Sequence, residues 1–196
     1  MIRVKICGNT NLEDSLFCAK EGADALGFVF APSPRKVEAE IVRQIVESLP
    51  PYVAAVGVFQ NAPLEEVKWI KDYCRLGWVQ LHGQESESYA SHFYPFVIKT
   101  IFSLDEAKSD YPCSAYLWDR KKGSSSEFEI PGFLEHFPKP FILAGGITLE
   151  TLEKVSGVKN LYGLDVTRGV EVFPGKKDLE KVKKFLSLAK GWSGPC

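Results

Sequence analysis

A thiol and a carboxyl group follow two short apolar runs of the sequence, at places where strands would end. Cys7 follows Val-Lys-Ile, and Asp119 follows Tyr-Leu-Trp. A carboxylic acid can donate a proton, and a thiolate can accept one or act as a nucleophile, so these two groups could carry acid–base or covalent chemistry. Each also has an ordinary explanation, because Cys7 could be an inert core thiol and Asp119 could cap the loop that follows it.

Three more polar residues could bind a substrate. Asp165 lies inside the apolar run Gly-Leu-Asp-Val, where an acid needs a partner to offset the cost of its desolvation. Arg35 follows Pro-Ser-Pro, a stiff loop that could hold its guanidinium group for recognition of a carboxylate, although a solvated loop arginine is equally compatible. His82, in Gln-Leu-His-Gly, could orient a substrate or bond the loop backbone.

Glycines follow two further apolar runs. Gly145 and Gly146 come after Phe-Ile-Leu-Ala, and Thr167-Arg168-Gly169 comes after Gly-Leu-Asp-Val. Glycine-containing loops let backbone N–H groups approach an anion closely. Either loop alone could be a plain tight turn, but two such loops on neighbouring strands favour a site for a phosphate group.

Charge and composition exclude several partners. The chain carries 24 Lys and Arg against 25 Asp and Glu, with a formal net charge of -1, so we expect neither nucleic acid nor a membrane surface as a partner. No His, Cys, Asp and Glu residues have the spacing of metal ligands. A small-molecule substrate remains, and the sequence leaves open whether the protein is a monomer or a homodimer.

The five cysteines are irregularly spaced and include no Cys-x-x-Cys pair. This pattern argues against both a disulfide framework and a zinc site, and it favours reduced thiols in the cytoplasm. No apolar stretch approaches the ~20 residues of a membrane span, and the start of the chain does not resemble a signal peptide.

The elements that would position these residues alternate between strand and helix. Short apolar runs without polar alternation are typical of strands in a parallel sheet that is covered on both faces. They are predicted at residues 3–6, 25–30, 53–59, 78–81, 96–101, 115–118, 141–144 and 161–166. Eight strands favour a closed (β/α)8 TIM barrel over a flavodoxin-like sheet, which needs about five.

At 196 residues the chain is short for this fold, and we expect a single domain over residues 1–196. The sixth helix should be abbreviated to residues 131–137, after a polar loop. Capping boxes are predicted at Thr10 to Glu13 and at Ser103 to Glu106, and Thr148 should cap the helix after the seventh strand. The last helix should bury one face and expose its lysines.

Short motifs in one order along nearly the whole chain resemble the phosphoribosylanthranilate isomerase family of tryptophan biosynthesis. The most specific are Val-Lys-Ile-Cys-Gly at 4–8, Gln-Leu-His-Gly at 80–83 and Leu-Ala-Gly-Gly at 143–146. Gly-Leu-Asp-Val at 163–166, Gly-Val-Glu at 169–171 and Pro-Gly-Lys-Lys-Asp at 174–178 follow in the same order.

The resemblance implies an isomerase that needs no cofactor or metal. Its reaction would be the Amadori rearrangement of N-(5-phosphoribosyl)anthranilate to 1-(o-carboxyphenylamino)-1-deoxyribulose 5-phosphate. By resemblance, Asp119 would be the general acid and Cys7 the general base. Arg35 would bind the anthranilate carboxylate, Asp165 would contact the anthranilate amine or a ribose hydroxyl, and the two glycine loops would hold the phosphate.

Several positions depart from the family pattern, among them Asn9 and the proline loop before Arg35, which is one residue short; two other loops matter most. Gly-Ser-Ser-Ser stands at 123–126 in place of Gly-Gly-Thr-Gly, and Thr167-Arg168-Gly169 replaces Ser-Ser-Gly. These departures leave two alternatives: a drifted, non-catalytic barrel that binds a phosphosugar, or a related phosphosugar isomerase. Indole-glycerol-phosphate synthase fits less well, because it would need a set of catalytic lysines and a longer N-terminus.

Overall fold

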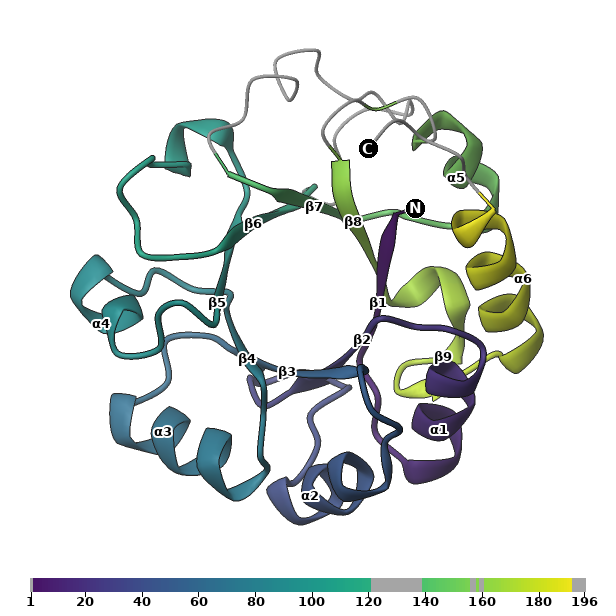
Figure 1. Ribbon diagram of the computed structural model, residues 1–196, viewed down its shortest axis with the longest axis horizontal. Helices are drawn as coiled ribbons and strands as arrows, with labels where there is room; N and C mark the ends of the chain where they lie inside the picture. Colours follow the sequence, from purple (N-terminus) through teal and green to yellow (C-terminus); the bar gives the residue numbers. More distant parts are fainter. Residues whose placement is uncertain (1, 121–138, 156–157, 159–160, 192–196) are drawn as a thin grey trace.

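Parallel strands form a closed barrel at the centre of the protein (Figure 1). The computed structural model describes residues 2–120, 139–155, 158 and 161–191 of the chain. Within these residues the barrel order runs from β1 to β8, and β8 pairs with β1. The strands are β1 (Arg3–Cys7), β2 (Ala25–Val29), β3 (Ala54–Phe59), β4 (Trp78–Leu81), β5 (Val97–Ile101), β6 (Ala115–Asp119), β7 (Phe141–Ala144) and β8 (Leu161–Val166).

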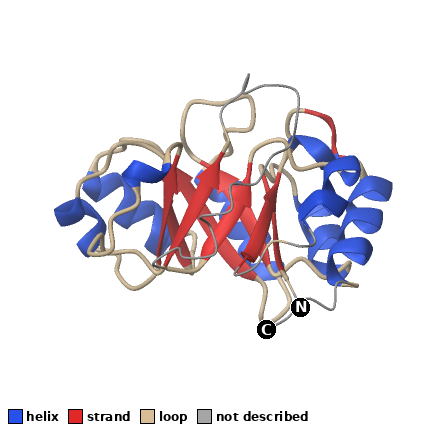
Figure 2. Ribbon diagram, turned by 90° about the horizontal axis from the view of Figure 1, so that it is seen from above, coloured by secondary structure: helices blue, strands red, loops and turns tan. Residues whose placement is uncertain are grey.

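Helices surround the barrel, as Figure 2 shows from the side. They are α1 (Leu12–Lys20), α2 (Ala39–Ser48), α3 (Leu64–Tyr73), α4 (Glu87–Ser91), α5 (Leu149–Val155) and α6 (Leu179–Lys190). Short 3-10 turns, η1 (Leu104–Glu106) and η3 (Arg168–Val170), follow β5 and β8, and a hairpin of β9 (Glu171–Phe173) and β10 (Lys176–Lys177) precedes α6. The predicted TIM barrel is confirmed, and no helix in the described ranges is long and apolar enough to cross a membrane.

The predicted strands are confirmed to within one residue at each end. The cap at Thr148 is also confirmed, because its hydroxyl accepts a hydrogen bond from the backbone N–H of Thr151. In α6 the predicted buried face is present: Val182, Phe185 and Leu186 are inaccessible to solvent, while the intervening lysines are exposed. The predicted sixth helix at 131–137 lies outside the described residues.

Two capping predictions need correction. The N-cap of α1 is Asn11 rather than Thr10, since the Asn11 side chain accepts from the backbone N–H of Asp14 at 2.9 Å. Thr10 instead donates to the carbonyl of Gly175 at 2.6 Å and so anchors the β9–β10 hairpin. After β5, the contact of Ser103 with Glu106 forms, but it begins only the single 3-10 turn η1.

The barrel separates two apolar regions. One lies between the helices and the outer faces of the strands and includes most of the buried apolar residues. The other lies inside the barrel and consists of Val56, Ile98, Ala115, Leu117, Ile142 and Ala144. Polar side chains share the interior, and the buried ones are Lys5, Gln80, Thr100 and Asp165. The inward-facing side chains therefore include a set of polar groups in addition to an apolar layer.

The corrected cap predicts how α1 responds to substitution. Asn11→Ala should lower the free energy of unfolding by about 1 kcal/mol, because the N–H of Asp14 would lose its acceptor. Glu13→Ala should change it by less than about 0.5 kcal/mol, since Glu13 is exposed and plays no part in the observed cap. Urea unfolding of both variants measures the difference, and a larger loss in Glu13→Ala than in Asn11→Ala would indicate a capping box at Thr10 after all.

Candidate active site

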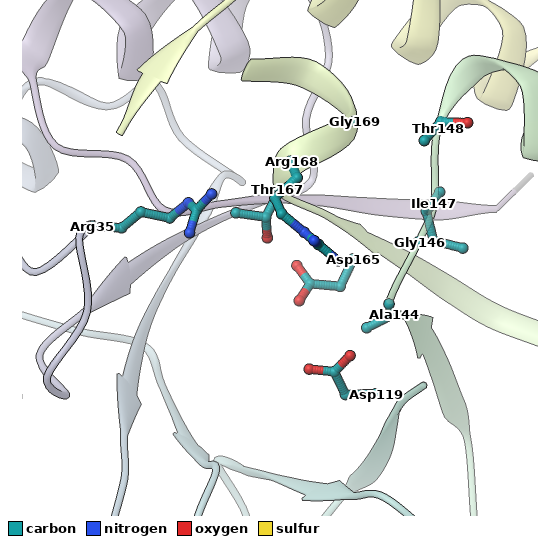
Figure 3. A pocket seen from close by; sticks show the side chains of 11 residues that line it. Arg35, Asp119, Ala144, Gly146, Ile147, Thr148, Asp165, Thr167, Arg168 and Gly169 are labelled. Carbon is teal, nitrogen blue, oxygen red and sulfur yellow. The ribbon is translucent and has the colours of Figure 1, made fainter. Parts of the chain in front are cut away.

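A cavity of about 480 Å3 opens at the carboxyl ends of the strands. Residues of the loops that follow β2, β6, β7 and β8 line it, and Figure 3 shows their side chains converging on one space. Most of the predicted site residues line this cavity: Arg35, Asp119, Gly145, Gly146, Asp165, Thr167, Arg168 and Gly169. Ala144, Ile147 and Thr148 complete the lining. The cavity occupies the usual position of an active site in this fold.

Asp119 ends β6 and faces Asp165 across the cavity (Figure 3). Burial raises the pKa of Asp119 to about 6, and the charge of Asp165 contributes to the rise, while Arg168 and Lys5 oppose it. An ordinary aspartate is almost fully ionised at pH 6, whereas here about half of the carboxyl groups would still hold a proton. Asp119 can therefore donate a proton near neutral pH.

His82 lies beside this carboxyl group, although it is not among the residues that line the cavity. Its Nε2 is 3.9 Å from Oδ2 of Asp119, and its Nδ1 is 3.2 Å from the hydroxyl of Thr100. Burial lowers the pKa of His82, so the imidazole is neutral at physiological pH. His82 is thus positioned to contact either Asp119 or a group bound next to it.

Cys7 ends β1 and is buried behind the cavity, close to an ion pair. Lys5 and Asp165, neighbours in the β1–β8 register, hold this pair with 2.9 Å between Nζ and Oδ1. Burial raises the pKa of the Cys7 thiol above its ordinary value, and the charge of Lys5 works in the opposite direction. The thiol is therefore protonated in most molecules at neutral pH.

Arg35 is held by a carboxylate of the protein itself. Its Nε lies 2.9 and 3.0 Å from the two oxygens of Glu171, and its Nη2 is 2.6 Å from Oε2. Both side chains are largely buried, with 16% and 3% exposure. A bidentate contact of this kind fixes the plane of the guanidinium group and directs it at the cavity.

Glu171 connects Arg35 to the backbone of Cys7. Burial would raise the pKa of Glu171, but its bonds to Arg35 and the charge of Lys177 bring it below its ordinary value. The ammonium group of Lys177 is fully buried, 3.2 Å from Oε1 of Glu171, and donates to the carbonyl of Cys7 at 2.5 Å. Asp14 accepts from the backbone N–H of Lys177, which fixes the hairpin to α1.

The two glycine loops touch each other beside the cavity. A Cβ on Gly169 would lie 2.2 Å from the carbonyl oxygen of Ile147, so only glycine permits this approach of the β8 loop to the β7 loop. Gly145 has a φ of +78°, and a Cβ there would collide with the backbone of Arg120 and with Asp119. The close approach thus brings the predicted anion-binding loops and Asp119 into one site.

Three functional residues were missed at the level of the sequence: Lys5, Glu171 and Lys177. Glu171 and Lys177 lie in motifs that supported the family resemblance but received no role. Lys5 lies in the middle of an apolar strand, which is the same signal that identified Asp165. Lys5 lies two residues before the end of β1, whereas the predicted site residues lie at strand ends and in the loops after them.

Comparison with known proteins identifies close relatives. A family described as N-(5'phosphoribosyl)anthranilate (PRA) isomerase matches residues 4–187. The N-(5'-phosphoribosyl)anthranilate isomerase of Geotalea uraniireducens is 41% identical over 204 residues, which cover 97% of this chain and 100% of the relative. That of Pelobacter propionicus is 37% identical over 212 residues, covering 97% of this chain and 96% of the relative.

Solved structures agree with these matches. Phosphoribosyl anthranilate isomerase from Thermus thermophilus superimposes with a TM-score of 0.83 at 41% identity, covering 96% of this chain and 99% of that one. A phosphoribosyl anthranilate isomerase in complex with reduced 1-(o-carboxyphenylamino)-1-deoxyribulose 5-phosphate gives 0.84 at 36% identity, covering 97% and 100%. An aldolase from Zymomonas mobilis, at 12% identity and 0.71, shares the fold alone.

The buried contacts of Glu171 predict a large loss of stability on substitution. Glu171→Gln should lower the free energy of unfolding by about 2–4 kcal/mol, because it leaves Lys177 and Arg35 without a compensating charge. Glu47→Gln is the matched control: its pairs with Arg43 and Arg75 are exposed, so the loss should be under about 1 kcal/mol. Equal losses in urea unfolding would contradict the proposed importance of the buried contacts.

Proposed function

The chain belongs to the N-(5'-phosphoribosyl)anthranilate isomerase family and is an isomerase of tryptophan biosynthesis, and for its reaction we propose that Asp119 is the general acid and Cys7 the general base. The reaction is the Amadori rearrangement of N-(5-phosphoribosyl)anthranilate to 1-(o-carboxyphenylamino)-1-deoxyribulose 5-phosphate. The observation that supports these roles is the placement of the two proton-transfer groups on strands β6 and β1, each near Asp165.

The first step opens the ribose ring. Asp119 donates its proton to the ring oxygen while the bond between that oxygen and C1′ breaks, and the bonding electrons remain on the oxygen. The lone pair of the anthranilate nitrogen forms a double bond to C1′, which gives an iminium ion. The raised pKa of Asp119, about 6, supports this role because it keeps part of the carboxyl groups protonated near neutral pH.

The second step moves the double bond. The thiolate of Cys7 takes the proton from C2′, and the electrons of that C–H bond form a double bond between C1′ and C2′. The iminium electrons return to nitrogen, which gives an enolamine. A proton then adds to C1′ and the C2′ hydroxyl loses one, which leaves the ketone of the product. The sum of these transfers is an isomerisation, with no electrons supplied or removed.

The remaining residues would bind the two ends of the substrate. Glu171 occupies Nε and Nη2 of Arg35, and Nη1 has no partner among the described residues, so it would receive the anthranilate carboxylate. The backbone of Gly145, Gly146 and Gly169 would hold the phosphate, with Thr167 and Arg168 beside it. Asp165 would contact the anthranilate amine or a ribose hydroxyl, and His82 would orient the sugar next to Asp119.

The surroundings of the enzyme follow from its chemistry. Cys7, Cys18, Cys74 and Cys113 are free thiols, which supports a reducing, cytoplasmic location. Its partner is a small phosphorylated molecule, and we assign it no nucleic acid or membrane partner. A related enzyme from Thermotoga maritima is described as dimeric and has been converted to monomers, so either a monomer or a homodimer is compatible with this family.

Substitution of the acid and the base tests their roles. Cys7→Ala and Asp119→Asn should each lower kcat by about 10²-fold or more with little change in KM, because each removes a proton transfer and leaves the binding groups in place. Turnover of freshly generated N-(5-phosphoribosyl)anthranilate is followed as the loss of anthranilate fluorescence. Cys74→Ala and Asp105→Asn, which change the same residue types away from the cavity, are the controls.

The outcomes separate the alternatives. If the unaltered protein binds a product analogue but does not turn over the substrate, it is a non-catalytic phosphosugar-binding barrel. If either variant keeps the kcat of the unaltered protein, the role assigned to that residue is wrong.

Arg168 should contribute to phosphate binding. It lines the cavity and its charge acts on Asp119, although the residue is also exposed to solvent. Arg168→Ser should therefore raise KM about tenfold, and the increase should shrink at high salt, where a partly exposed ion pair is screened. Lys183→Ser, which removes an exposed charge from α6, is the control. If KM of Arg168→Ser is unchanged at low ionic strength, the Arg168 side chain does not bind the phosphate, and the backbone N–H groups of the glycine loops bind it without that side chain.

A further inference from the structure

Lys5 and Cys7 point into the barrel from the same face of β1, two residues apart. The side chain of Lys5 is only 4% exposed, so its ammonium group is almost entirely removed from water. A buried ammonium group needs partners, and Asp165 supplies one at 2.9 Å. The thiol of Cys7 is its second neighbour, and the charge of Lys5 acts on that thiol.

Gly27, which pairs with Cys7 in the barrel, provides the space for this contact. A Cβ at Gly27 would lie 2.5 Å from Sγ of Cys7 and 2.9 Å from Nζ of Lys5. Any larger residue would therefore occupy the place where the thiol and the ammonium group meet. A lysine that only neutralised Asp165 would not require this space.

The ion pair has a direction. Its positive end lies at Cys7, and its negative end faces Asp119 across the cavity (Figure 3). Lys5 acts on Cys7 more strongly than Asp165 does, whereas Asp165 acts on Asp119 more strongly than Lys5 does. The pair thus favours a proton on Asp119 and opposes one on Cys7, which is the arrangement that the reaction requires.

We propose that Lys5 is a positioning residue of the isomerase, whose ammonium group stabilises the thiolate form of Cys7, the form that removes the C2′ proton. This inference rests on the proposed role of Cys7 as the base. We assign Lys5 no contact with the substrate, because it acts through the thiol of Cys7.

Other charged groups also face Cys7. Lys177 donates to its carbonyl, and the charge of Arg35 is close enough to interact with the thiol. Glu171 binds both of these cations. Its carboxylate neutralises one of the two positive charges, so Lys177, Arg35 and Glu171 together carry one positive charge near Cys7. Asp165 is the anion that opposes the thiolate directly. Of these cations, Lys5 is the one whose ammonium group lies with the thiol beside Gly27.

Titration of the Cys7 thiol tests the proposal independently of turnover. Thiolate absorbance at 240 nm is measured against pH in the unliganded protein, and the signal of a matching Cys7→Ala protein is subtracted so that other thiols and tyrosines cancel. Lys5→Gln, which keeps a hydrogen-bond donor without the charge, should raise the titration midpoint by about one unit or more. Lys5→Met provides the same comparison without the donor.

Two further variants show whether Lys5 acts directly on the Cys7 thiol or only neutralises the charge of Asp165. Lys99→Gln breaks another buried lysine–carboxylate pair, with Glu85 at 3.0 Å, and should leave the Cys7 midpoint unchanged. In Lys5→Gln combined with Asp165→Asn, the midpoint should stay above that of the unaltered protein. A return to the unaltered midpoint would show that Lys5 only neutralises Asp165, and it would overturn the proposal.

Activity gives a second readout. At pH 7, Lys5→Gln should lower kcat by about tenfold, because the pKa values of Asp119 and Cys7 move further apart. The alkaline pH at which kcat falls should move up together with the Cys7 midpoint, which a merely structural defect would not produce. An unshifted midpoint in both Lys5 variants would overturn the proposal even if kcat fell. A shifted midpoint together with full activity of Cys7→Ala would instead reject the role of Cys7 as the base.

Discussion

Closure of the barrel between β1 and β8 is the constraint on which the site depends. This pairing brings the first and last strands of the chain together and sets Lys5 opposite Asp165 in the register. Because both side chains are largely buried, with 4% and 8% exposure, each needs the other to offset the cost of its desolvation. The acid, the base and the cavity are all arranged around this ion pair. The geometry of the site therefore depends on the pairing of β1 with β8.

The site also needs rigid support outside the barrel, and the β9–β10 hairpin supplies it. Glu171 and Lys177 from this hairpin reach Arg35 and the backbone of Cys7, while Asp14 holds the hairpin to α1. These contacts lie behind the cavity rather than in it. Buried charges that each have two or more partners leave few alternative arrangements, so the guanidinium group and the Cys7 backbone keep one orientation.

The sequence was sufficient to predict the strands, since continuous apolar runs have few other interpretations, and it located Asp119, Asp165 and the glycine loops at strand ends. It was not sufficient to predict the groups that support them. Lys5 lies within a strand, and its partner is 160 residues away, so the contact exists only in the closed barrel. The cap at Asn11 was missed for a related reason: Thr10 meets Gly175, a residue of the distant hairpin.

The electrostatics of the site explain why one pair of charges is placed between two proton-transfer groups. Asp119 with a pKa of about 6 and Cys7 with a pKa raised by burial share a single proton at neutral pH, and it resides mainly on the thiol. The reaction needs that proton on the carboxyl group instead. Each unit by which the two pKa values approach each other raises the reactive fraction about tenfold. An ion pair with its cation at Cys7 and its anion facing Asp119 acts on both values at once, whereas a single cation near both groups would favour the thiolate but also ionise the acid.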